Sequence, residues 1–203
     1  MTTRKIAVIA AGVSTPSSTR MLADRLAAAV GEALRERGVP AQVEINELRG
    51  HARALADAIV TGFPSGELRD AIRAVTTADA VVAVTPVFAA SYSGLFKTFV
   101  DVLEPDALVG KPVLLAATAG TARHSLVIEH AMRPLFSYLR ALTVPTGVFA
   151  APEDWAGGDT TPLSTRIDRA AGELADLMTS RAPARAADPF DDPTPFESLL
   201  ADS

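Results

Sequence analysis

The sequence predicts an α/β fold, a three-layer α/β/α sandwich built on a five-stranded parallel sheet. Short apolar runs alternate with longer amphipathic segments, which is typical of β-α units. Three of the runs, IAVIA, AVVAV and VLLAA, are apolar at every position, as strands covered by helices on both faces are. The expected strands are residues 6–10, 43–45, 80–84, 113–117 and 143–149.

Apolar residues at helical spacing predict the connecting helices. They are expected over residues 21–34, 95–103, 126–139 and 162–180. Pro134 should kink the third of these, because proline lacks the N–H that a helix interior requires. Gly62, Pro64 and Gly66 divide the helical segment 51–75, so we expect two short helices or a loop there.

The chain is expected to form one domain, residues 1–181, followed by a distinct segment, residues 182–203. Its 203 residues, 48% of them hydrophobic, suffice for one sizeable core. The last segment contains four prolines and several acidic residues, together with Phe190 and Phe196. It is either a disordered tail or an arm whose apolar side chains dock on a neighbouring subunit.

Composition excludes several classes of protein. The net charge is -5 and no basic stripe is present, which argues against nucleic-acid binding. Without cysteine there are no disulfides or thiolate nucleophiles, and the three histidines are too scattered for a zinc site. No apolar run is long enough for a membrane span or a signal peptide. We therefore expect a cytoplasmic protein without a metal.

The loop after the first strand, AGVSTPSSTR, has the character of a phosphate site. In parallel sheets, ligands bind beyond the carboxyl ends of strands where the strand order reverses, as FMN does in flavodoxin. Gly12 permits a tight turn, and Arg20 adds a fork-shaped donor. Hydroxyls beside a helix N-terminus suit a phosphate, and this loop has five, on Ser14, Thr15, Ser17, Ser18 and Thr19. The alternative is a capping cluster. The loop matches neither a Walker motif nor G-x-G-x-x-G.

The loop after the third strand, TPVFAASYSGLFKTFVD, could hold a planar ring. Pro86 is expected to end the strand, which would leave the backbone of residues 86–88 free for a ligand. The small residues at 89–91 and Ser93 keep the surface shallow enough for a planar ring to approach. Phe88 and Tyr92 are candidate aromatic walls of that ring site. The alternative is an ordinary strand-to-helix turn.

These stretches resemble a known family. TPVFAASYSGLFKTFVD is similar to the signature of NAD(P)H-dependent FMN reductases of the flavodoxin-like superfamily, which read Thr-Pro-Val-Tyr, small residues, then Tyr-Ser-Gly-x-x-Lys. TAGTARHS, residues 118–125, is similar to the family's Thr-Gly-Gly-Thr-x-x-His. The resemblance covers residues 5–178 and implies a flavodoxin-like sandwich with strand order 2-1-3-4-5. Phe88 and Ala119 depart from the pattern, and the first loop lacks the usual Gly-Ser-x-Arg order.

The resemblance implies which residues contact FMN. The phosphate would meet Ser14, Ser17, Ser18, Thr19 and Arg20, the ring and ribityl chain would lie along Pro86, Val87 and Phe88 near Tyr92 and Ser93, and the pyrimidine end would meet Ala119, Gly120 and Thr121. Amide donors there would favour the negatively charged reduced ring. Arg123 and His124 could assist, or be solvated residues at a helix start. No catalytic side chain is expected, because hydride transfer to flavin is cofactor chemistry.

His130 is a second feature that the resemblance makes informative. It falls near the position where two-component flavin reductases carry an inserted residue linked to weak, exchangeable flavin binding at a tetramer interface. If His130 is that residue, the protein would use FMN as a substrate and release it. The alternative is an exposed helical histidine.

The resemblance implies an NAD(P)H:FMN oxidoreductase that uses NADPH or NADH and forms a homodimer or homotetramer. It would supply reduced FMN to a flavin-dependent monooxygenase, and the Phe-containing tail resembles that of actinobacterial members paired with luciferase-like monooxygenases. One alternative is a quinone or azo reductase with tightly held FMN. Another is a flavodoxin-type electron carrier, which the chain's length and lack of a strongly acidic face disfavour.

Overall fold

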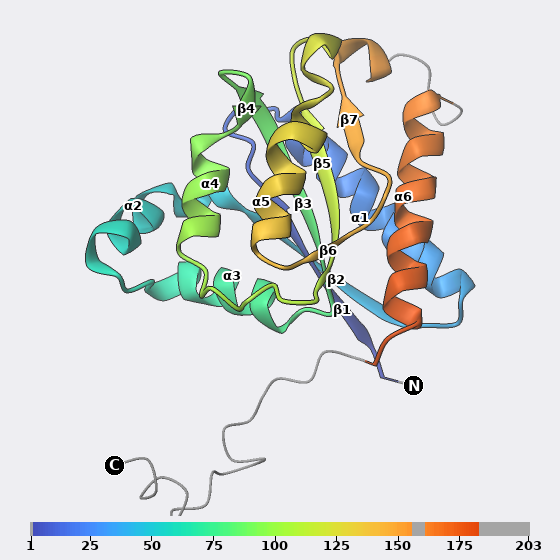
Figure 1. Ribbon diagram of the computed structural model, residues 1–203, viewed down its shortest axis with the longest axis horizontal. Coiled ribbons are helices and arrows are strands. Elements are labelled where there is room, and N and C mark those ends of the chain that lie inside the picture. The colour runs from blue at the N-terminus through green and yellow to red at the C-terminus, as the bar shows by residue number, and fades with distance from the viewer. Residues whose placement is uncertain (1, 156–160, 183–203) are drawn as a thin grey trace, which may run out of the picture.

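The structure, a computed structural model, describes residues 2–155 and 161–182 (Figure 1). The expected C-terminal tail or arm therefore lies outside the described residues, apart from Ala182. Within the described part, no helix is long and apolar enough to cross a membrane.

A parallel sheet runs through the molecule (Figure 1). Its strands are β1 (Arg4–Ala10), β2 (Ala41–Glu47), β3 (Ala80–Phe88), β5 (Pro112–Thr118), β6 (Leu142–Thr143) and β7 (Val148–Ala150). The order is β2-β1-β3-β5-β6, and β7 also pairs with β5. Because β6 and β7 share the place of the fifth predicted strand, the predicted order 2-1-3-4-5 is confirmed. The sequence pattern does not predict β4 (Ser91–Tyr92), which pairs antiparallel with the end of β3.

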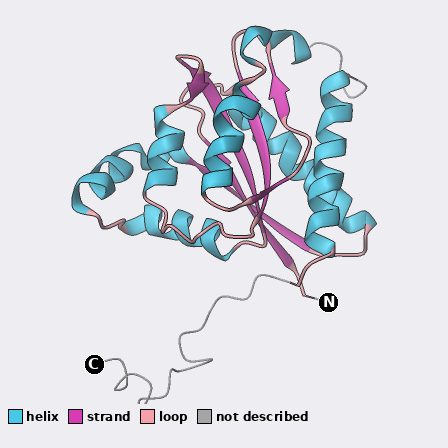
Figure 2. Ribbon diagram, in the orientation of Figure 1, coloured by secondary structure: helices cyan, strands magenta, loops and turns pink. Residues whose placement is uncertain are grey.

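Helices cover both faces of the sheet, as Figure 2 shows. One face carries α1 (Ser18–Glu36) and α6 (Pro162–Thr179), and the other carries α2 (Ala52–Thr61), α3 (Gly66–Thr77), α4 (Gly94–Asp101) and α5 (Arg133–Tyr138). Side chains alternate between the two cores. Along β1, Ile6 and Val8 pack in the core beneath α1 and α6, whereas Ala7 and Ile9 pack in the opposite core. The predicted three-layer sandwich is confirmed.

Two helical predictions concerned segments with proline and glycine. The segment 51–75 is divided as expected, because Gly62 ends α2 in the left-handed conformation at φ 78°. The segment 126–139 is helical without a break from Val127 to Tyr138, but it is not α-helical throughout. A π-helical turn, Ile128–Met132, precedes α5, and Pro134 lies in the first turn of α5. The π-helical turn runs directly into α5, with the Arg133 N–H bonded to the Ile128 carbonyl, so Pro134 follows residues that are already helical and its missing N–H removes one hydrogen bond from a continuous helix.

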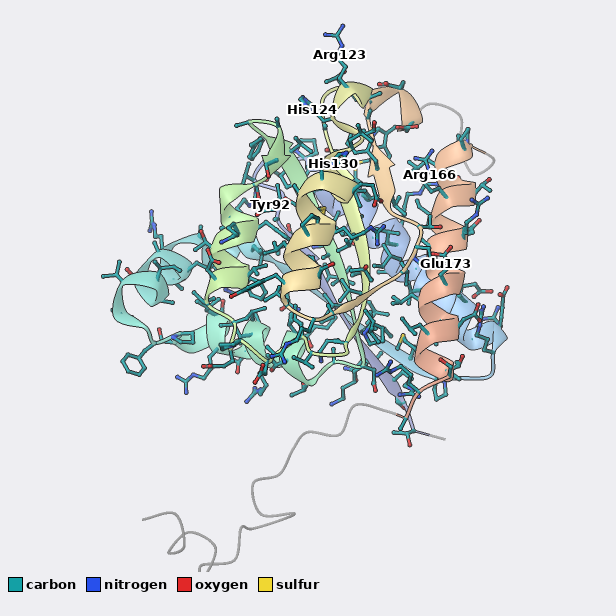
Figure 3. The ribbon with its side chains drawn as sticks, in the orientation of Figure 1. Tyr92, Arg123, His124, His130, Arg166 and Glu173 are labelled. Atoms are coloured by element: carbon teal, nitrogen blue, oxygen red, sulfur yellow. The ribbon has the colours of Figure 1, made fainter. Side chains whose placement is uncertain are left out.

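The fifth predicted strand is interrupted between β6 and β7. Pro145 has no N–H for a neighbouring strand, and Thr146 donates its N–H and hydroxyl to the Glu173 carboxylate at 2.8 and 2.7 Å. Glu173 lies on α6 (Figure 3). From the opposite face, Arg133 of α5 donates to the carbonyl oxygens of Val144 and Pro145 at 3.1 and 3.0 Å. The interruption is therefore held from both helical layers.

Buried basic groups join elements at the amino-terminal edge of the sheet. Arg4 is 8% exposed and donates to Asp79 Oδ1 at 3.1 Å and to the Met178 carbonyl at 2.9 Å. Lys111 donates to the carbonyls of Thr76 and Ala78 at 2.9 and 2.6 Å, and burial lowers the pKa of its ammonium. Arg4 therefore connects the start of β1 to the end of α6 and to Asp79 after α3, and Lys111, directly before β5, binds the end of α3.

Replacing Arg4 by methionine should destabilise the protein by about 3 kcal/mol, because buried oxygens lose a charged donor. The matched control is Arg35→Met, since Arg35 forms a solvent-exposed pair with Glu32 whose loss should change the free energy of unfolding much less. Urea unfolding measures both free energies. Equal losses in the two variants would contradict the structural role given to Arg4.

Candidate functional site

The carboxyl ends of β1, β3 and β5 lie at one edge of the sheet, at the top in Figure 1. From β1 the chain crosses to β2 on one side, whereas β3 and β5 lie on the other. The strand order therefore reverses beside β1, which is where ligands bind in open parallel sheets. The three connections after these strands, residues 11–17, 89–93 and 119–125, form the candidate site.

The first connection folds tightly over the N-terminus of α1. Ser17 is the N-cap, and its hydroxyl accepts a hydrogen bond from the Arg20 N–H at 3.2 Å. A Cβ on Gly12 would lie 2.1 Å from Ser17 Oγ and 3.0 Å from Thr19 Cβ. A side chain at position 12 would therefore displace the capping Ser17 hydroxyl, so the chain passes close to the helix end, whose free amides favour an anion.

The hydroxyls of this connection have separate roles. Ser17 caps α1, and Thr19 is buried, with its hydroxyl 2.8 Å from that of Thr118 at the end of β5. Ser14 and Ser18 are exposed. The capping interpretation thus accounts for Ser17, while Ser14 and Ser18 remain at the surface beside the helix N-terminus.

Arg20 lies beside this connection but is engaged by acids. Its Nε donates to Asp24 at 2.9 Å, and its Nη1 contacts Glu47 at the end of β2. The hydrogen bond with Asp24 raises the pKa of the Arg20 guanidinium. A second guanidinium reaches the connection instead: Arg49 donates to the hydroxyl of Thr15. Sequence reasoning missed Arg49, although the run LRGHAR, which contains no acid, could have drawn attention to it.

The second connection corrects one expectation. Pro86 does not end the strand, because β3 continues to Phe88, with Pro86 in register with Thr118 of β5. Val87 and Phe88 then pair with β4. Proline keeps a backbone compatible with a strand and loses only its N–H, so the ladder can pass through it at an end position. The backbone of residues 86–88 is therefore not left free of strand partners.

The β3–β4 hairpin turns on two alanines. Ala89 and Ala90 have φ values of 48° and 66°, the left-handed conformation that a tight two-residue hairpin requires and that glycine or asparagine usually supplies. Phe88, beside the turn, is 49% exposed. Tyr92 packs on Phe96 with ring centroids 5.9 Å apart, so part of its ring contributes to the core. Phe88 is thus the more exposed of the two candidate walls.

Buried hydroxyls attach the hairpin to α4. Ser93 is the N-cap of α4 and accepts from the Phe96 N–H at 3.2 Å. The Ser93 N–H in turn donates to the hydroxyl of Thr85 at 3.0 Å, and both residues are buried. The hairpin is therefore fixed at its base, next to the end of β5.

The third connection contains the residues expected near a pyrimidine ring. The Ala119 N–H donates to the Ala150 carbonyl at 3.1 Å, while Gly120 is exposed. Thr121 caps a short 3-10 helix, Ala122–His124. Arg123 extends away from the molecule at the top edge (Figure 3), and no hydrogen bond or ion pair joins its side chain to another described residue. Assistance from Arg123 and His124 stays a prediction.

The π-helical turn lies beside the site. It contacts β4 and β5, and His130 within it is exposed. A π turn holds one residue more than an α-helical turn and is frequent at functional sites. A Cβ on Gly147 would lie 2.7 Å from Ile128 Cγ2, so the interruption between β6 and β7 leaves the space that this turn occupies.

The arrangement is suited to holding a flat, phosphate-bearing ligand. It offers a helix N-terminus without an acidic first-turn residue, a shallow hairpin and a row of connections at one sheet edge. Within residues 2–155 and 161–182, no three His, Asp or Glu side chains gather as a metal site would require.

Comparison with known proteins gives a consistent result. The family model described as NADPH-dependent FMN reductase matches residues 4–156. A Pseudomonas aeruginosa protein named FMN reductase (NADPH) is 36% identical over 180 residues, which cover 88% of this chain and 94% of the relative. The NADH-dependent FMN reductase SfnE of Pseudomonas putida is 39% identical over 175 residues, covering 85% and 91%.

A solved structure shares the fold closely. An oxidoreductase from Corynebacterium diphtheriae superposes with a TM-score of 0.85 at 49% sequence identity. The match covers 89% of this chain and 99% of that one.

The two alanines of the hairpin turn yield a stability prediction. Ala90→Gly should raise the free energy of unfolding by about 1 kcal/mol, because glycine adopts positive φ without strain. Ala28→Gly, on the exposed side of α1, should lower it by about the same amount. Thermal and urea unfolding measure both. Destabilisation by Ala90→Gly would contradict the left-handed turn.

Proposed function

The chain belongs to the NADPH-dependent FMN reductase family, and we propose that it takes FMN from solution, reduces it and releases it. As an NAD(P)H:FMN oxidoreductase, it would take a hydride from NADPH or NADH. Flavin and nicotinamide supply the chemistry of hydride transfer between nicotinamide C4 and flavin N5, and the protein supplies binding and orientation. The meeting of the three connections at one sheet edge is the observation that carries this proposal.

The residues of the first connection fit an FMN phosphate. The backbone turns closely enough at Gly12 that a Cβ would collide with Ser17, and α1 presents its N-terminal amides there. The exposed hydroxyls of Ser14 and Ser18 lie on either side of the N-cap in the sequence. A phosphate gains both hydrogen bonds and the favourable end of the helix dipole at such a place.

The other two connections would hold the ring system. The β3–β4 hairpin offers small side chains at Ala89 and Ala90 and an exposed aromatic ring at Phe88. In the third connection, the backbone of Gly120 and Thr121 would face the pyrimidine end. Amide donors placed there favour negative charge, which collects on the flavin when it is reduced. No acid-base pair is needed for this role.

Release of FMN is supported by the π-helical turn next to β4. The turn contains the exposed His130, near the position where the resemblance suggests an inserted residue. Reduced FMN would then pass to a flavin-dependent monooxygenase, and the protein would act as a homodimer or homotetramer. A cytoplasmic location stays a prediction.

The test is the rate of NADPH and NADH oxidation by purified apoprotein as free FMN is raised. We expect the rate to saturate with FMN and to be negligible without it. The release of FMN would be contradicted if FMN copurified with the protein and the rate of NADPH or NADH oxidation depended on added quinone or azo dye instead of added FMN. No flavin binding at all would contradict the proposed site.

A substitution tests the first connection. Gly12→Ala should raise the Kd for FMN about tenfold or more, because the new Cβ displaces the Ser17 hydroxyl that caps α1 and so disturbs the helix N-terminus that would receive the phosphate. The control is Gly31→Ala in α1, where a Cβ meets nothing within 4 Å. It should leave the Kd unchanged and stabilise the helix by about 0.5–1 kcal/mol. Flavin fluorescence titration measures both Kd values, and an unchanged Kd in Gly12→Ala would refute the assignment.

A further inference from the structure

The first connection brings hydroxyls to the site but no charge of its own. Residues 11–19 contain no lysine, arginine, aspartate or glutamate. The N-terminus of α1 contributes the equivalent of roughly half a positive charge, whereas a phosphomonoester carries nearly two negative charges at neutral pH. A positively charged side chain from another helix or strand would be needed to neutralise the rest of the phosphate charge.

Arg20 is poorly placed to be that cation. Two carboxylates, Asp24 and Glu47, contact its guanidinium from α1 and from the end of β2. A phosphate that approached Arg20 would have to displace one of these acids or lie beside it, and like charges at such distances repel. The same two contacts give Arg20 another role, which is to attach the first turn of α1 to β2.

Arg49 is free of such competition. It lies in the 3-10 helix Leu48–His51 that follows β2, and its Nη1 donates to the Thr15 hydroxyl in the first connection. It is exposed, and none of the described acids forms an ion pair with it. A guanidinium has five N–H donors in a planar fork that matches phosphate oxygens, so this contact leaves most of its donors available.

The surroundings of Arg49 are also favourable to an anion. The chain continues directly into α2, whose first turn has no acidic residue. Arg53, in that turn, is exposed and makes no hydrogen bond or ion pair with another described residue. Glu47, the described acid nearest to Arg49 along the chain, is paired with Arg20.

We propose that Arg49 binds the phosphomonoester received at the first connection, and that Arg20 instead positions α1 against β2. This inference rests on the proposed function and names a specificity-determining residue for it. Two substrates of the reaction carry a phosphomonoester: FMN at the ribityl 5′ position and NADPH at the adenosine 2′ position. Riboflavin and NADH are the same molecules without that group.

The experiment compares these matched ligands in the full chain. In Arg49→Gln, the Kd for FMN, measured by flavin fluorescence, should rise about tenfold or more while the Kd for riboflavin stays within about twofold. That result assigns Arg49 to the flavin phosphate. If FMN binding is unchanged but the KM for NADPH rises about tenfold while that for NADH does not, Arg49 binds the 2′-phosphate. Arg49→Lys should restore part of either loss.

The controls separate this inference from the proposed function. Arg53→Gln removes a neighbouring exposed charge and should change each constant by less than about twofold, and circular dichroism establishes that the variants fold. If the wild-type protein reduces FMN but Arg49→Gln has the same constants for FMN, riboflavin, NADPH and NADH, the role given to Arg49 is overturned. The proposed FMN reductase function is then unaffected. If Arg20→Gln, and not Arg49→Gln, lost the preference for FMN over riboflavin, the role given to Arg49 would also be overturned. If the wild type does not bind FMN, the proposed function itself fails.

Discussion

Parallel pairing of β1, β3 and β5 is the constraint on which the rest of the structure depends. Parallel neighbouring strands must be joined by crossover connections, and here helices on both faces of the sheet form these connections. All three strands therefore end at the same edge, and their following connections become neighbours although they are separated by dozens of residues. The position of the site is fixed by this pairing before any side chain of the site is considered.

Within that frame, most buried hydroxyls serve the protein's own structure. Thr19 and Thr118 join the first helix to the end of β5, and Thr85 and Ser93 fix the base of the hairpin. What the connections still offer a ligand is mainly backbone, with small side chains around it. This suits a reaction in which the flavin and nicotinamide carry the chemistry and the protein holds them in place.

The interruption of the fifth predicted strand connects the two helical layers to the site. Glu173 of α6 and Arg133 of α5 bind its backbone from opposite faces of the sheet. Gly147 in the same stretch leaves room for Ile128 of the π-helical turn, which contacts β4. A change in the conformation of this turn would therefore shift the hairpin that borders the proposed position of the flavin ring.

Local patterns in the sequence determined the layers and the break at Gly62, because apolar periodicity and glycine act over a few residues. The strand order was implied only by the family resemblance. The sequence did not determine the β4 hairpin, since its turn uses two alanines where glycine or asparagine would have signalled it. Nor could it show that Arg20 meets Glu47 or that Arg49 meets Thr15. Those contacts join residues 27 and 34 positions apart. They exist only because the pairing of β2 with β1 places the carboxyl ends of these two strands side by side. The charge balance at the site was therefore decided by the tertiary structure.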